Sequence, residues 1–268
     1  MPLNAEIYYR HSFEGDSESA PVILIHGAGG THLHWPAQIR RLPGNRVYAL
    51  DLPGHGKSEG RGNQTIKSYC DSIIRWMEHI HIFRGVIVGH SMGGAIAIYM
   101  ALNHHEHVVA LGLVGSGARL RVAPVIFENS SSPTTFPIAV KAIMDRAFSP
   151  HTDPRLKYLA AQKMETTRPS VLHGDFQACN VFDMMESIKI IRVPTLVICG
   201  KDDQFTPVRY SQYLADQIPK AQPRIIPEAG HMVMLEQPQA VANELSSFLA
   251  ILTYSPGQSN ENKATKNQ

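Results

Sequence analysis

Short apolar runs without polar alternation constrain the fold of this 268-residue chain more than any other feature. Five such runs, rich in β-branched residues and bounded by turn residues, are 22–25, 47–50, 86–88, 108–114 and 195–198. Strands of this kind are buried on both faces, as in a parallel sheet covered by helices. Between and after them lie amphipathic stretches, over residues 65–81, 95–102 and 238–252. The alternation predicts an α/β fold with a mostly parallel central sheet flanked by helices.

The pattern of strands breaks after residue 114 and resumes at residue 195. The chain between these points contains helical stretches and prolines but no convincing buried strand. We expect residues 117–191 to form an inserted helical cap, and residues 1–116 and 192–254 to form the core domain. Residues 255–268 are rich in Asn, Gln, Ser and Lys, and we expect this tail to be disordered.

Composition excludes several classes of function. Lys and Arg total 25 against 23 Asp and Glu, so no excess of one charge favours nucleic acid as a partner. No apolar run is long enough to span a membrane, and the first residues resemble no export signal. The three cysteines, Cys70, Cys179 and Cys199, have no C-x-x-C spacing, which argues against a disulfide framework or a zinc site. We therefore expect a cytoplasmic protein without a membrane span.

A G-x-S-x-G motif occupies residues 89–93, directly after the apolar run 86–88 and before a helical stretch. The glycines Gly89 and Gly93 leave room for a tight turn between strand and helix, because side chains there would collide with neighbouring backbone. Such a turn would present Ser91 as a nucleophile. The alternative is a glycine-rich turn whose serine only caps the helix.

A second glycine-rich loop, residues 26–30, follows the apolar run 22–25. Acyl transfer needs two backbone N–H groups directed at the developing oxyanion. The candidates are the N–H groups of Ala28, in this loop, and Met92, directly after the serine. A phosphate-binding loop is excluded, because neither G-x-x-x-x-G-K-[ST] nor G-x-G-x-x-G occurs here.

Five segments together resemble motifs of the α/β-hydrolase fold superfamily, and the resemblance extends from about residue 5 to residue 249. They are the oxyanion loop at 26–27, the D-x-P-G-x-G-x-S turn at 51–58, the nucleophile elbow at 89–93, the acid loop at 200–207 and the histidine loop at 230–232. The resemblance implies the α/β-hydrolase fold, with the helical cap inserted after strand 6. It also implies a serine carboxylesterase-like activity.

A serine hydroxyl needs a base, and the base needs an orienting carboxylate. The chain order Ser91, Asp203, His231 matches the order of nucleophile, acid and base in this fold. The family spacing after Gly200 selects Asp203 as the acid, and the adjacent Asp202 is the alternative. These residues are the predicted catalytic triad.

Two other residues beside the motifs are assigned structural roles. His90 precedes the nucleophile, and we expect its side chain to point away into the packing. Asp51 ends an earlier strand, and its motif is typical of a residue that stabilises a turn.

The predicted function is hydrolysis of small-molecule carboxylic esters with small to medium apolar acyl or alkyl groups, through an acyl-enzyme on Ser91. This chemistry needs no metal and no organic cofactor. The substrate-binding residues are left unassigned, and a homo-oligomer is possible. Apolar side chains of the cap suit an apolar substrate or simply pack on the core: Phe127, Phe136, Ile138, Ile143, Met144, Phe148, Met164, Phe176, Phe182 and Met185. Arg119, Arg121 and Arg168 are candidates to meet a substrate carboxylate, although surface arginines usually only solvate a face.

Other activities on the same triad stay open: lactonase, carbon–carbon bond hydrolase and cofactor-free perhydrolase. Carbon–carbon hydrolases of this superfamily typically carry Trp after the catalytic histidine, where this chain has Met232. Haloalkane dehalogenases carry Asp at the elbow, so Ser91 excludes their chemistry. A non-catalytic ligand receptor or carrier is a remote alternative, since one fold hosts many functions.

Overall fold

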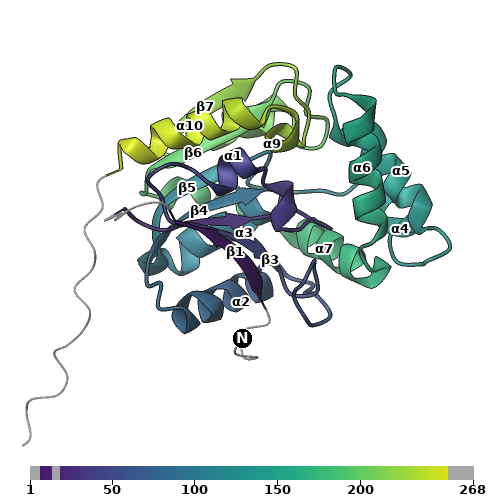
Figure 1. Ribbon diagram of the computed structural model, residues 1–268, viewed down its shortest axis with the longest axis horizontal. Coiled ribbons are helices and arrows are strands. Elements are labelled where there is room, and N and C mark those ends of the chain that lie inside the picture. Colours follow the sequence, from purple (N-terminus) through teal and green to yellow (C-terminus); the bar gives the residue numbers. More distant parts are fainter. Residues whose placement is uncertain (1–6, 14–18, 253–268) are drawn as a thin grey trace, which may run out of the picture.

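The computed structural model describes residues 7–13 and 19–252, and the tail 255–268 lies outside the described residues. The described chain contains a seven-stranded sheet with the order β1-β3-β2-β4-β5-β6-β7 (Figure 1). β1 pairs antiparallel with β3, and every other neighbouring pair is parallel. The strands are β1 (Tyr8–Ser12), β2 (Val22–Ile25), β3 (Val47–Asp51), β4 (Gly85–His90), β5 (Val108–Val114), β6 (Thr195–Gly200) and β7 (Ala221–Ile226).

Helices cover both faces of the sheet, because alternate residues of the central strands enter two separate cores. In β2, Ile23 and Ile25 pack in one core, and Val22 and Leu24 pack in the other. The first core includes side chains of α2 (Ile66–His79), α3 (Met92–Asn103) and α8 (Val208–Gln217). The second includes side chains of α1 (Ala37–Arg40), α9 (Val233–Glu236) and α10 (Pro238–Ala250). The predicted α/β fold with a mostly parallel sheet is confirmed.

The predicted strands with continuous apolar runs agree best with the structure. β2 and β5 coincide with the runs 22–25 and 108–114, and every residue of β2 is buried. α2 begins after Thr65, whose side chain accepts a hydrogen bond from the Ser68 N–H at 3.1 Å and caps the helix. β1 was not predicted, because it is a half-exposed edge strand of aromatic and polar residues.

Between β5 and β6 the chain forms four further helices, which we call the cap helices. They are α4 (Pro124–Asn129), α5 (Phe136–Ala147), α6 (Pro154–Glu165) and α7 (Pro169–Val181). Each has proline at its first or second position, where the missing N–H costs no helical hydrogen bond. These helices follow β5, the fifth strand along the described chain, and the placement of the cap after strand 6 of the family fold stays a prediction. Figure 1 shows α4, α5 and α6 grouped beside the sheet.

Short 3₁₀ helices complete the described elements: η1 (His32–His34), η2 (His105–His107) and η3 (Ile188–Ile190). The three cysteines are all buried and free. Among the helices within residues 7–13 and 19–252, none combines the length and apolar character that crossing a membrane requires.

Candidate active site

Ser91 stands in a strained turn between the end of β4 and the start of α3, with φ 52° and ψ −115°. Positive φ is unfavourable for any residue with a side chain, so close packing must hold it. A Cβ at Gly89 would collide with the Gly93 carbonyl, and a Cβ at Gly93 with the Ile25 carbonyl. The expectation that side chains at both positions would collide with neighbouring backbone is confirmed.

Asp203 lies in the loop after β6 and bonds the ring of His231 through its Oδ2, at 2.9 Å from Nδ1. Its Oδ1 accepts the N–H groups of Phe205 at 2.8 Å and Thr206 at 2.9 Å. The Thr206 hydroxyl donates to Oδ2 at 2.7 Å. Burial alone would raise the pKa of Asp203, but His231 and these hydrogen bonds hold that pKa far below its ordinary value. The carboxylate is therefore charged at neutral pH.

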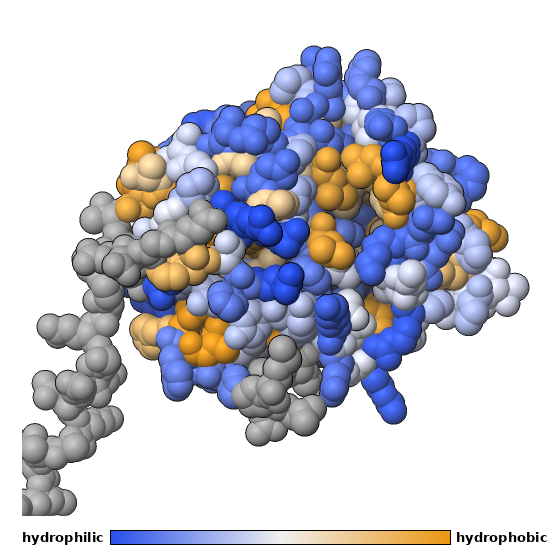
Figure 2. All heavy atoms as spheres, in the orientation of Figure 1, coloured by the Kyte–Doolittle hydropathy of each residue, from blue (hydrophilic) through white to orange (hydrophobic). Residues whose placement is uncertain are grey.

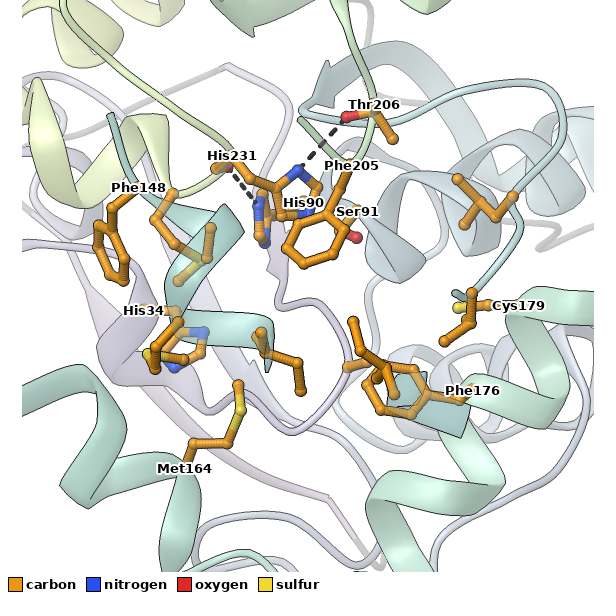
Figure 3. A pocket seen from close by; sticks show the side chains of 18 of the residues that line it. His34, His90, Ser91, Phe148, Met164, Phe176, Cys179, Phe205, Thr206 and His231 are labelled. Carbon is orange, nitrogen blue, oxygen red and sulfur yellow. Dashed lines mark hydrogen bonds between the residues drawn. The ribbon is translucent and has the colours of Figure 1, made fainter. Parts of the chain in front are cut away.

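The bond to Asp203 assigns the tautomer of His231. Because a carboxylate accepts, the Nδ1 carries the proton, and Nε2 is left with a free lone pair. His231 and Ser91 both line one pocket (Figure 3), and within the described chain no hydrogen bond joins the serine hydroxyl to the ring. Such bonds are often absent without substrate and form in the complex.

The two adjacent aspartates, Asp202 and Asp203, bond different partners. The Oδ2 of Asp202 accepts the hydroxyl of Ser149 at 2.6 Å, so this side chain faces the segment after α5. Asp203 alone of the pair bonds His231. Asp51 accepts the Lys57 N–H at 2.9 Å, which agrees with its expected role in stabilising a turn.

His90 is buried, as expected, but its side chain does not point away from the site. Its Nε2 lies 2.9 Å from the backbone oxygen of His231, and the two ring centroids are 4.8 Å apart (Figure 3). Since a carbonyl only accepts, Nε2 carries the proton of a neutral ring. Burial and the nearby His231 lower the pKa of His90 well below its ordinary value. His90 therefore holds the backbone of His231 in place without adding charge.

The backbone amides near Ser91 divide into paired and unpaired groups. In the loop after β2, the Gly29 N–H donates to Asp175 at 2.8 Å and the Gly30 N–H to Gly27 at 3.0 Å. The N–H of Ala28, the residue before Gly29 in this loop, has no acceptor within the described chain. The same holds for the Met92 N–H at the first position of α3, where helices leave amides unpaired. Ala28 also lines the pocket with Ser91.

The carboxylate of Asp175, a fully buried residue of α7, connects the cap helices to the glycine-rich loop after β2. Besides the Gly29 N–H, it accepts the Tyr69 hydroxyl at 2.5 Å and bonds His55 Nε2 at 2.8 Å. Burial alone would lower the pKa of His55, but the charge of Asp175 and its hydrogen bond raise it. Contact with Asp175 therefore favours the charged form of His55.

The pocket above Ser91 lies between the sheet's loops and the cap helices and contains about 900 Å³ of empty space, including its mouth. Figure 2 shows hydrophobic side chains gathered on this face between the sheet and α4–α6. The cap and neighbouring segments contribute an apolar lining: Leu120, Val122, Ile126, Ile143, Met144, Ala147, Phe148, Ala160, Met164, Phe176 and Cys179. In the part of the chain that the structure describes, no three His, Cys, Asp or Glu side chains are arranged to hold a metal ion.

The three candidate arginines all bond the protein itself. Arg121 lines the pocket, but its guanidinium donates to the Leu120 and Phe182 carbonyls at 2.6 and 3.1 Å. It also pairs with Asp183 at 3.3 Å.

Arg119 pairs with Asp183 as well, at 3.6 Å. Arg168 donates to the Gly54 and Gly60 carbonyls at 3.2 and 2.5 Å. None of the three is therefore placed as a free partner for a substrate carboxylate.

Comparison with known proteins agrees with this geometry. Residues 22–244 match the model of the alpha/beta hydrolase family. The chain belongs to this family. This fold places its nucleophile on a sharp turn from strand to helix, with the acid and the histidine later in the chain.

Three similar proteins illustrate the range of the alpha/beta hydrolases. A 2-hydroxy-6-oxo-6-(2'-aminophenyl)hexa-2,4-dienoic acid hydrolase of Metapseudomonas resinovorans is 31% identical over 250 residues, covering 86% of this chain and 84% of the relative. The structure of a thermophilic esterase has a TM-score of 0.78 at 30% identity, covering 91% of this chain and 99% of its own. The enol-lactonase of Burkholderia xenovorans has a TM-score of 0.84 at 22% identity, covering 91% and 96%, and shows the fold alone.

The sequence did not identify Thr206, His90 and Asp175 as supports of the site. For Thr206 a local signal existed, because a hydroxyl three residues after an aspartate often bonds it within a turn. His90 stands beside the nucleophile, but its contact with His231 crosses 141 residues. Asp175 meets Gly29 across 146 residues and has no local signal.

Buried neutral histidines around the site predict a loss of stability in acid. Burial, with nearby positive charges, lowers the pKa of His34 to about 4, and burial also lowers the pKa of His26 and of His90. Unfolding exposes these rings, which then bind protons below the ordinary histidine pKa of about 6.5. The free energy of unfolding should therefore be fully present above that pH and fall below it, by about 1.4 kcal/mol per pH unit for each ring.

Urea unfolding between neutral pH and about pH 4 measures this slope. In His34→Gln the free energy of unfolding should fall less steeply with decreasing pH, because unfolding then takes up about one proton fewer in that window. The variant His105→Gln is the control, because the His105 side chain is 83% exposed and stays in water in both states. Parallel curves for the wild type and His34→Gln would contradict the assignment of a neutral buried ring.

Proposed function

We propose that this alpha/beta hydrolase is a serine hydrolase that cleaves carboxylic esters through an acyl-enzyme on Ser91. The observation that carries the proposal is the bond between Asp203 and His231, at 2.9 Å, beside a serine in a strained turn. Ser91 and His231 line the apolar pocket and Asp203 bonds His231, although 112 residues or more separate the serine from the other two.

In the first step, the Nε2 of His231 takes the hydroxyl proton of Ser91 as its Oγ bonds the ester carbonyl carbon. The carbonyl electrons move onto oxygen, where the N–H groups of Ala28 and Met92 would stabilise the negative charge. Asp203 keeps its charge and stabilises the imidazolium that forms. The tetrahedral intermediate then expels the alcohol, which takes the proton from His231 and leaves the acyl group on Ser91.

Water completes the reaction by the same route. His231 takes one of its protons, and the water oxygen bonds the acyl carbon. The bond from that carbon to Ser91 then breaks, and the serine oxygen recovers the proton from His231. The products are a carboxylic acid, an alcohol and the unchanged protein.

The pocket supports an apolar acyl or alkyl group as the main substrate feature. Ile143, Met144, Phe148, Met164 and Phe176 line it, so these cap side chains predicted from sequence meet the cavity. Burial of such a group gains about 25 cal/mol per Å² of apolar surface removed from water.

Hydrolysis of a carbon–carbon bond is a second candidate, favoured by the relative that is 31% identical and acts on a 2-hydroxy-6-oxo dienoic acid. Such a substrate carries a carboxylate. The one cationic side chain that lines the pocket in the described chain, Arg121, is bonded to two carbonyls and to Asp183. The apolar lining therefore favours a neutral ester. Lactonase and perhydrolase activities use the same groups and stay open.

Replacing the nucleophile tests the proposal directly. Ser91→Ala should lower kcat/KM on p-nitrophenyl esters by about a thousandfold or more, because no other group attacks the carbonyl. A series of acyl chains from acetyl to palmitoyl should show highest activity for short to medium chains.

Ser247→Ala serves as the matched control, since Ser247 is exposed on α10, and it should equal the wild type. Wild-type inactivity on every chain length, or equal activity of Ser91→Ala, would rule out a serine esterase and favour the other candidates.

The carboxylate of Asp175 offers a test of the oxyanion loop. Asp175→Asn removes the negative charge and turns one carboxylate oxygen into an NH2 group that cannot accept. The Gly29 N–H and His55, which share Oδ2 in the wild type, are then held less firmly, so the loop that carries Ala28 shifts. We expect kcat to fall by about tenfold or more, with a smaller change in KM, because oxyanion donors act mainly in the transition state.

Tyr69→Phe removes a hydrogen bond from the same carboxylate without touching Gly29. It should lose a similar stability, about 1–2 kcal/mol, and keep its kcat. Equal losses of kcat in both variants would show that Asp175 acts on stability alone.

A further inference from the structure

His34 is a polar side chain in the wall of an otherwise apolar part of the pocket. It ends η1, in the loop that follows the oxyanion segment, and it lines the cavity with Ser91 and Met164. Figure 3 shows its ring across the pocket from Phe176. The catalytic mechanism proposed above does not use this ring.

Apart from Ser91, the proposed nucleophile, the other histidines of the lining, Thr206 and Arg121 each make at least one hydrogen bond, although the Nδ1 of His90 is also unpaired. His231 and Thr206 bond Asp203, His90 bonds the backbone of His231, and Arg121 bonds two carbonyls and Asp183. The ring of His34 makes no hydrogen bond within the described chain, and its Nδ1 is buried without a partner. The ring therefore keeps its hydrogen-bonding capacity free for a group bound in the cavity.

The packing behind the ring fixes its orientation. A Cβ on Gly30 would lie 2.8 Å from His34 Nδ1 and 2.9 Å from His26 Nδ1, so the imidazoles pack against bare backbone there. Of the two ring nitrogens, only Nδ1 is fully buried without a partner, so Nε2 is the one that a ligand in the cavity could reach. Because this packing already restricts the ring, hydrogen bonding to a ligand costs little further side-chain entropy.

The charge of His34 restricts the kind of ligand group. Burial and nearby positive charges lower its pKa to about 4, so the ring is neutral at pH 7. It then offers one N–H donor or one lone pair and no positive charge. A neutral carbonyl or hydroxyl oxygen suits such a ring, whereas a carboxylate would lose its hydration and gain no opposite charge.

We propose that His34 hydrogen-bonds a neutral oxygen-bearing substituent, an oxo or hydroxyl group, carried on the apolar chain of the ester substrate. This inference rests on the proposed ester hydrolysis and makes it more specific. The preferred substrate would be an oxo- or hydroxy-substituted ester rather than a purely hydrocarbon one. The apolar lining would hold the carbon chain, and His34 would select the position of the oxygen.

Matched esters test the proposal. We would compare p-nitrophenyl octanoate with mono-oxo analogues in which the oxo group moves along the chain, and octyl acetate with the corresponding analogues. The first set places the oxygen in the acyl part and the second in the alcohol part. At one position, wild-type kcat/KM should exceed that of the unsubstituted parent by about tenfold or more, since a hydrogen-bonding site rejects analogues that leave it unpaired.

The variants separate recognition from packing. In His34→Leu the ratio of oxo ester to parent should fall by about tenfold, whereas His34→Gln, which keeps a neutral donor and acceptor, should restore most of it. His105→Leu, at an exposed site, should leave the ratio unchanged. Circular dichroism and thermal unfolding would establish that each variant is folded.

Binding to Ser91→Ala, measured by calorimetry with the same uncleaved esters, gives a readout that does not depend on turnover. Tighter binding of the oxo ester, lost on adding His34→Leu, supports the role of His34 even if hydrolysis fails. A ratio that does not change in His34→Leu, or a wild type that prefers the parent at every position, overturns it. Absence of hydrolysis with selective binding retained overturns only the proposed esterase activity.

Discussion

The positive φ of Ser91 is the constraint on which the active site depends. A residue in this conformation costs about 1–3 kcal/mol, and the surrounding structure must supply that free energy. It does so through the close meeting of β4, α3 and β2, where Gly89 and Gly93 have no room for a side chain. The same turn places Ser91 directly before the first amide of α3, which has no acceptor within the described chain. The packing of the fold therefore sets the position of the candidate nucleophile through the φ angle of one residue.

Electrostatics around the proposed triad follow a second pattern, in which each of two buried carboxylates contacts a histidine. Asp203 and Asp175 are buried carboxylates, and each bonds a histidine, at 2.9 and 2.8 Å. Burial lowers the pKa of His90 and of His34, so both rings stay neutral at pH 7. This matters for the proposed reaction because His231 becomes positive during it. A charged ring at the position of His90, 4.8 Å away, would oppose that step.

Much of the fold could be predicted from the sequence because its central strands are buried on both faces. Runs such as Val108–Val114 then read as continuous apolar segments. The edge strand Tyr8–Ser12 was missed because its residues are half-buried or exposed and none of them is aliphatic. Ser91 and His231 could be found from local motifs. The choice of Asp203 over Asp202 rested on family spacing, and the hydrogen bonds now provide a physical reason for it.

Contacts between distant segments could not be predicted. Asp175 meets His55 across 120 residues, and nothing near either residue in the chain indicates the partner. The sequence could not distinguish His34 from other loop histidines, because its place in the pocket wall depends on the cap side chains that surround it. A network of this kind is defined only when the cap helices lie on the core.

Covalent labelling tests the central claim most directly, that Ser91 is the nucleophile. We would treat the protein with a fluorophosphonate, follow loss of ester hydrolysis, and locate the adduct by mass spectrometry of the intact chain and its peptides. The account predicts a single phosphonyl group on the peptide that contains Ser91, formed in step with inactivation and absent in Ser91→Ala. Inactivation by modification of another residue, or full hydrolytic activity with Ser91 modified, would contradict it.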